Sequence, residues 1–151
     1  MIYNWLAHAH RLKYDNTLVL AMDRELYADL IQRREAAFDN SALLNQWNTT
    51  CLQRHIQAVR MERHLGIAAL VANGISVLHA EATAIFLHDV IPVLRAQPAD
   101  VDMLFQRDDW PMDPVRQMGT AVNTGLIFYR STKRTAVVRF ILDAIRRGLI
   151  E

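Results

Sequence analysis

The residues of this sequence best suited to chemistry are His79, Glu81 and Thr83, which alternate at the end of the apolar run Ile75–His79. Alternate side chains of an extended chain point the same way, so Glu81 and Thr83 are expected to face the same space. Two oxygen ligands in that arrangement can hold a divalent cation against a diphosphate. Only Glu81 is a carboxylate, however, and a capping or ion-pairing role for it is the competing interpretation.

The same segment matches the first half of a zinc motif. Nucleoside deaminases carry His-x-Glu, in which the histidine binds zinc and the glutamate transfers protons, followed by two cysteine ligands. The single cysteine of this chain, Cys51, lies upstream of His79. The zinc interpretation therefore fails, and an internal disulfide is excluded as well.

Other polar residues interrupt or follow apolar runs. Asp23 follows Thr17–Met22, and the acidic pair Asp108 and Asp109 comes just after Val101–Gln106. Adjacent side chains of an extended chain diverge, so at most one of the two aspartates is expected to face a shared site.

The segment Asn123-Thr124-Gly125 lies inside the apolar run Ala121–Tyr129. A glycine within a strand often allows a ligand or another backbone to approach closely. The asparagine beside it offers both hydrogen-bond donors and acceptors. This segment is therefore a candidate binding site within a strand.

The elements that must position these residues alternate along the chain. Apolar runs predict strands, with a further short extended segment at residues 83–87, and amphipathic patterns predict helices. The expected strands are 17–22, 75–79, 101–106 and 121–129; the expected helices are 4–12, 24–37, 51–72 in one or two pieces, and one that starts near Ser131 or Thr132. The helix that ends near Ala72 should stop at Gly74, which suits the left-handed position after a helix.

This alternation predicts an α/β architecture with a mostly parallel sheet flanked by helices. Ligands of such sheets bind at the carboxyl ends of the strands. Asp23, Glu81 and Asp108 all fall at predicted strand ends, which makes that edge of the sheet the expected site.

Composition narrows the class of protein. A chain of 151 residues fits a single domain, and its formal net charge of +1 gives no field that would attract nucleic acid. No stretch of about 18 apolar residues could span a bilayer, and residues 1–5 lack the pattern of a signal peptide. The chain as given is therefore expected to be cytoplasmic.

The order of these motifs resembles the nucleotide-diphospho-sugar transferase family, whose members include plant cell-wall xylosyl- and arabinosyltransferases. The similarity lies in Asn4-Trp5-Leu6, in the strand that ends at Asp23, in Gly74–Leu87 with Pro92 after it, and in Val122–Ser131. The resemblance implies a GT-A fold. It also implies that residues 1–151 form one partial domain, because the first nucleotide-binding strand and the later catalytic segment of the family have no counterpart here.

The resemblance further implies transfer of a sugar from a nucleotide sugar to a hydroxyl of a glycan or protein. Glu81 and Thr83 occupy the two aspartate positions of the family's metal-binding motif, so they would hold Mn²⁺ or Mg²⁺. Asp23, Asn123, Thr124 and Gly125 would contact the donor.

Asp108 and Asp109 are the catalytic candidates, placed to contact the sugar or the acceptor. A catalytically inactive binding or interaction module of the same fold is the alternative. A longer family member would be expected in the Golgi or secretory lumen.

Overall fold

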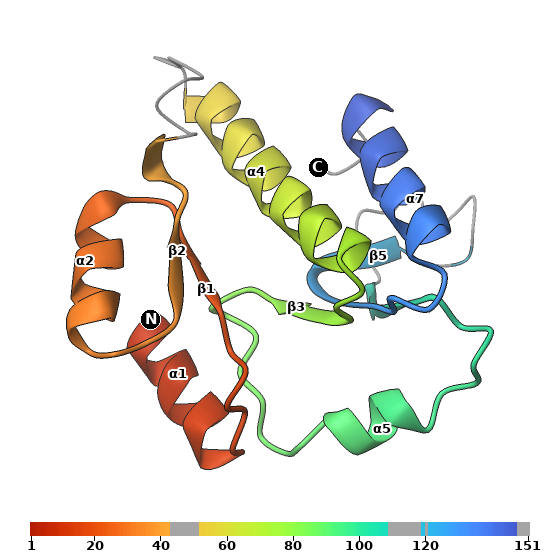
Figure 1. The fold of residues 1–151 in the computed structure, drawn as a ribbon, viewed down its shortest axis with the longest axis horizontal. Coiled ribbons are helices and arrows are strands. Elements are labelled where there is room, and N and C mark those ends of the chain that lie inside the picture. Colours follow the sequence, from red (N-terminus) through yellow and green to blue (C-terminus); the bar gives the residue numbers. More distant parts are fainter. Residues whose placement is uncertain (43–51, 109–118, 120, 148–151) are drawn as a thin grey trace.

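The computed structural model describes residues 1–42, 52–108, 119 and 121–147, with the side chains of residues 52–55 excepted. Helices and strands alternate along much of this part of the chain (Figure 1). In order they are α1 (Ile2–Arg11), β1 (Val19–Ala21), α2 (Arg24–Gln32), β2 (Ala37–Asp39), α4 (Leu52–Ala72), β3 (Val77–Ala80), α5 (Ile91–Arg95), β4 (Met103–Asp108), β5 (Ala121–Tyr129) and α7 (Arg134–Arg147).

The described strands form two small sheets, and the prediction of one mostly parallel sheet is wrong in this respect. β1 and β2 pair in parallel, whereas β5 lies between β3 and β4 and runs antiparallel to both. Apolar runs predict that a strand exists but carry no information about its direction. The α/β class itself is consistent with this mixed arrangement.

The first sheet belongs to a unit made by α1, β1, α2 and β2. Its core contains Leu6, Val19, Ala21 and Leu30. The helix expected to reach residue 37 ends earlier, because Arg34 adopts a left-handed conformation with a φ of 63°. Residues 37–39 then pair with β1 as a strand, which the helix-forming residues of this segment had not predicted.

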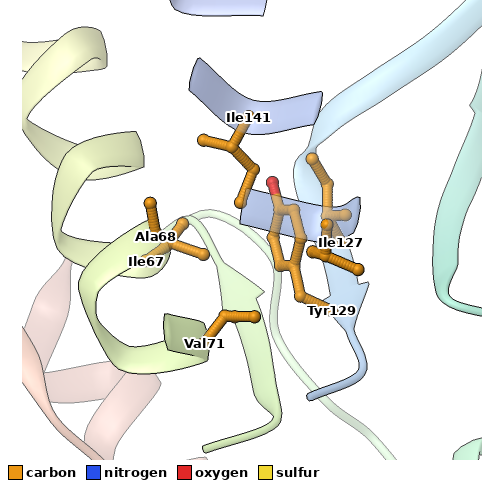
Figure 2. Close-up of a cluster of buried hydrophobic side chains, with 7 residues drawn as sticks. Ile67, Ala68, Val71, Ile127, Tyr129 and Ile141 are labelled. Carbon is orange, nitrogen blue, oxygen red and sulfur yellow. The ribbon is translucent and has the colours of Figure 1, made fainter. Parts of the chain in front are cut away.

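The second sheet is covered by α4 and α7, which pack against each other (Figure 1). α4 is one continuous helix, and it stops as predicted at Gly74, whose φ is 82°. Figure 2 shows the core between these helices and β5, formed by Ile67, Ala68, Val71, Ile127, Tyr129, Val137 and Ile141. The predicted C-terminal helix is confirmed as α7, which buries Val137, Ile141 and Ala144 but leaves Phe140 53% exposed.

Candidate functional site

The carboxyl ends of β3 and β4 meet at one edge of the antiparallel sheet. Both strands run opposite to β5, so they are parallel to each other across it. Ala80 at the end of β3 pairs with Leu126, and Asp108 at the end of β4 pairs with Ala121. The structure therefore brings Glu81 and Asp108 to the edge where β5 begins, as the strand-end argument anticipated, although through an antiparallel neighbour.

The segment Asn123-Thr124-Gly125 forms an irregularity in β5. Phe105 pairs with Ile127, but the next residue of β4, Gln106, pairs with Asn123, so residues 124–126 have no partner in the β4 register. The Asn123 side chain closes this bulge, because its Oδ1 accepts a hydrogen bond of 2.7 Å from the Gly125 amide. Bulges often redirect side chains beside active sites.

Gly125 is buried where β5 meets the end of β3. The backbone amide of Glu81 donates to the Gly125 carbonyl at 2.8 Å. A Cβ atom at this position would lie 2.9 Å from Asn123 Oδ1 and 3.1 Å from Glu81 Oε2. The absence of a side chain thus allows the glutamate carboxylate and the asparagine amide to approach the same point, as the glycine rule had predicted in general terms.

Asp108 completes the group, because its Oδ2 accepts a hydrogen bond of 3.2 Å from Asn123 Nδ2. We call Glu81, Asp108, Asn123 and Gly125 the bulge cluster. Thr124 instead lines a cavity of about 490 Å³ whose walls include Tyr129, Phe140 and Ile141. Thr124 therefore lies outside the bulge cluster, and its predicted contact with the donor stays a prediction.

Arg63 of α4 contacts the bulge cluster, and the sequence analysis did not single it out. Its Nη1 lies 2.8 Å from Glu81 Oε1, and its side chain is only 12% exposed, against 47% for Glu81. The available signal was the charged stretch from Arg60 to Arg63, which interrupts the apolar stripe of the helix. A mostly covered arginine is rarely found unpaired, so such an interruption indicates a partner.

Thr83 does not share the direction of Glu81 in the way the extended-chain argument required. The Ala84 amide donates to the Glu81 carbonyl at 2.8 Å, which closes a turn through residues 82 and 83. Thr83 is exposed on this turn. Residues 84–87, part of the expected extended segment, pair with no strand of the described chain. Trp5 Nε1 of α1 donates to the Ala84 carbonyl at 3.0 Å.

These residues fit Mn²⁺ or Mg²⁺ poorly. One oxygen of Glu81 is already paired with the Arg63 guanidinium, and Thr83 adds no charge. Within residues 1–42, 52–108, 119 and 121–147, no group of three histidine, cysteine, aspartate or glutamate side chains is placed to hold a metal ion. Affinity for these hard cations depends on charged oxygen ligands, so the predicted cofactor stays a prediction.

Two histidines lie under the site between α4 and the sheet. Burial lowers the pKa of His79 to about 3, with smaller contributions from the charges of Arg63 and His64. Burial also lowers the pKa of His64, whose Nδ1 donates to the Arg60 carbonyl at 2.7 Å. Both rings are therefore neutral at pH 7, and within the described part of the chain the buried Nε2 of His79 has no hydrogen-bond partner.

Asp23 is the N-cap of α2, and its carboxylate accepts a hydrogen bond of 2.7 Å from the Leu26 amide. Asp23→Ala should lower the free energy of unfolding by about 1 kcal/mol, the usual cost of losing such a cap. Urea denaturation measures this change. Because capping α2 accounts for the aspartate at position 23, the affinity of Asp23→Ala for nucleotide should stay at the wild-type value. A tenfold loss would instead support the predicted donor contact.

Asp109, the other aspartate of the predicted catalytic pair, lies outside the described residues.

The fold is of the α/β class, and its candidate site gathers two carboxylates, an amide and a glycine beside the ends of β3 and β4. Comparison with known families makes the assignment specific. The nucleotide-diphospho-sugar transferase family matches residues 12–144, and the chain belongs to this family. Four residues at the site, Glu81, Asp108, Asn123 and Gly125, fall within the matched segment.

The chain is also similar to the β-arabinofuranosyltransferase RAY1 of Arabidopsis thaliana. The two are 27% identical over 160 aligned residues, which cover all of this chain but 29% of the relative. The chain thus spans less than a third of that protein's length. No solved structure matches the chain significantly. In the part of the chain that the structure describes, no helix is long and apolar enough to cross a membrane.

Proposed function

We propose that this chain contributes the donor site of a glycosyltransferase that moves a sugar from a nucleotide sugar to a hydroxyl group of a glycan or protein. The observation that supports it is the bulge cluster, in which hydrogen bonds of 2.7 to 3.2 Å link Asp108 to Asn123, Asn123 to Gly125, and Gly125 to the backbone of Glu81. This cluster lies within the family-matched residues, and its amide and carboxylate groups are of the kinds that bind sugar hydroxyls.

In the proposed reaction the acceptor hydroxyl oxygen bonds to the anomeric carbon of the donor sugar. The bond from that carbon to the β-phosphate oxygen breaks, and the nucleoside diphosphate leaves with the bonding electrons. The acceptor proton passes to a base. Asp108 is our candidate for that base, since it is half-buried at the edge and held by Asn123.

A second function, a non-catalytic binding module, is favoured by one specific feature. Thr83 stands at the second aspartate position of the family's metal motif, and it is exposed on a turn rather than aligned with Glu81. A protein of this second kind would bind the nucleotide sugar without consuming it.

Thermal unfolding in the presence of nucleotides tests the shared requirement of donor binding. UDP, GDP and their sugar conjugates should be added in parallel buffers that contain either MnCl₂ or EDTA. A ligand at 100 times its Kd stabilises the folded state by about 2.7 kcal/mol, which gives a clear rise in Tm. No shift with any of these ligands in either buffer would refute donor binding. A shift without release of nucleoside diphosphate from the donor would favour the binding module.

A further inference from the structure

A positively charged side chain, that of Arg63, contacts the bulge cluster. The guanidinium of Arg63 lies 2.8 Å from Glu81 Oε1 and is held by a stem packed inside the domain. Beside the larger effect of burial, its charge acts to lower the pKa of His79 on β3, His64 on α4 and Tyr129 on β5. A positive charge in such a mostly covered position interacts strongly with a nearby anion, because little water screens it.

We propose that Arg63, rather than a divalent metal, offsets the charge of the donor diphosphate in this protein. The inference rests on the proposed donor site and deepens it. An arginine presents five N–H donors in a planar fork that matches a phosphate group, and it needs no second carboxylate to hold it in place. This accounts for the two departures from the family's metal motif together: Thr83 carries no charge, and Glu81 is already paired.

The Arg63–Glu81 pair also defines how a diphosphate would enter. The Glu81 side chain is 47% exposed whereas that of Arg63 is 12% exposed, so the carboxylate is the more accessible partner of the pair. A diphosphate carries more negative charge than one carboxylate, and it would displace Glu81 from part of the guanidinium. Glu81 therefore competes with the diphosphate for Arg63, whereas in a metal-dependent site it would assist binding as a ligand.

The two roles of Glu81, competitor or metal ligand, predict opposite effects on UDP affinity when its charge is removed. UDP is the probe, because it carries the diphosphate and lacks the sugar, and its affinity is measured by calorimetry in EDTA and in MnCl₂. Wild-type affinity should agree within about twofold between the two buffers. Glu81→Gln should bind UDP several-fold more tightly in EDTA because the competing charge is removed. Weaker binding by Glu81→Gln, or wild-type binding that requires Mn²⁺, would overturn the inference while leaving the proposed function intact.

Arg63→Gln should weaken UDP binding about 10- to 100-fold in both buffers, the range expected for loss of a charge-assisted hydrogen bond. Arg63→Lys retains the charge on a long stem but lacks the planar fork of donors, so its UDP affinity should lie between those of the wild type and Arg63→Gln. Arg95→Gln removes an equal charge from the exposed surface of α5 and should bind as the wild type does. Unliganded melting curves confirm folding. Wild-type affinity in Arg63→Gln would refute the role of Arg63, and absence of UDP binding by the wild type in every buffer would refute this inference and the proposed function together.

Discussion

Gly125→Ala should fold almost normally and yet lose donor binding by about 10- to 100-fold. The new Cβ would lie 2.9 Å from Asn123 Oδ1 and 3.1 Å from Glu81 Oε2. Both neighbours are the ends of flexible side chains, so the fold can absorb the change by moving them. That movement separates the atoms that define the bulge cluster, and losing one or two hydrogen bonds to the donor costs about 1 to 3 kcal/mol, or about 10- to 100-fold in affinity. Calorimetry with the nucleotide sugar measures the loss.

The expected effect on stability is small, about 1 kcal/mol, because the hydrogen bond from the Gly125 amide to Asn123 is the main interaction lost. Gly66→Ala is the matched control. Its Cβ would meet Leu20 at 3.5 Å, an ordinary contact, and alanine is the better helix former within α4. This control should keep wild-type affinity. If Gly125→Ala also bound the donor normally, the bulge cluster would not be the donor site.

The sequence predicted which strand ends of the candidate site lie side by side better than it predicted which side chains meet there. Apolar runs that end in Glu81 and Asp108 mark strand ends, and parallel strands bring their ends together wherever they lie in a sheet. This held even though β5 intervenes in the opposite direction. The close approach at Gly125 was likewise predictable, because a glycine inside a strand often marks a bulge or a position that another group approaches closely.

What the sequence could not provide was contacts between residues distant along the chain. Arg63 precedes Glu81 by 18 residues, and no local pattern says which carboxylate a helical arginine will meet. The turn at residues 82 and 83 was missed for a different reason. Its residues, Ala82 and Thr83, carry no strong turn preference, and the turn is stabilised by the distant contact of Trp5 with the Ala84 carbonyl.

The free energy of unfolding should fall steeply as the pH drops below about 6.5, chiefly because of His79. Its pKa in the folded protein is about 3, whereas an unfolded histidine has a pKa near 6.5. Between these values the unfolded state binds a proton that the folded state does not, so acid favours unfolding. The expected slope is about 1.4 kcal/mol per pH unit for one histidine, or about 2 kcal/mol between pH 6.5 and pH 5. Burial lowers the pKa of His64 too, which adds to this trend.

Urea denaturation at pH 7 and pH 5 measures the effect, and His79→Gln isolates it. The glutamine does not titrate, so the variant should lose about one histidine's share of the pH dependence, even if it is less stable at pH 7 because the packing of β3 has changed. His88→Gln, at an exposed histidine, should retain the wild-type dependence. Equal pH dependence in His79→Gln and the wild type would mean that His79 accepts a proton in the folded state. In that case the interface under the site, where Arg63 repels a charged His79, would have to open at mildly acidic pH, and donor affinity should fall over the same range.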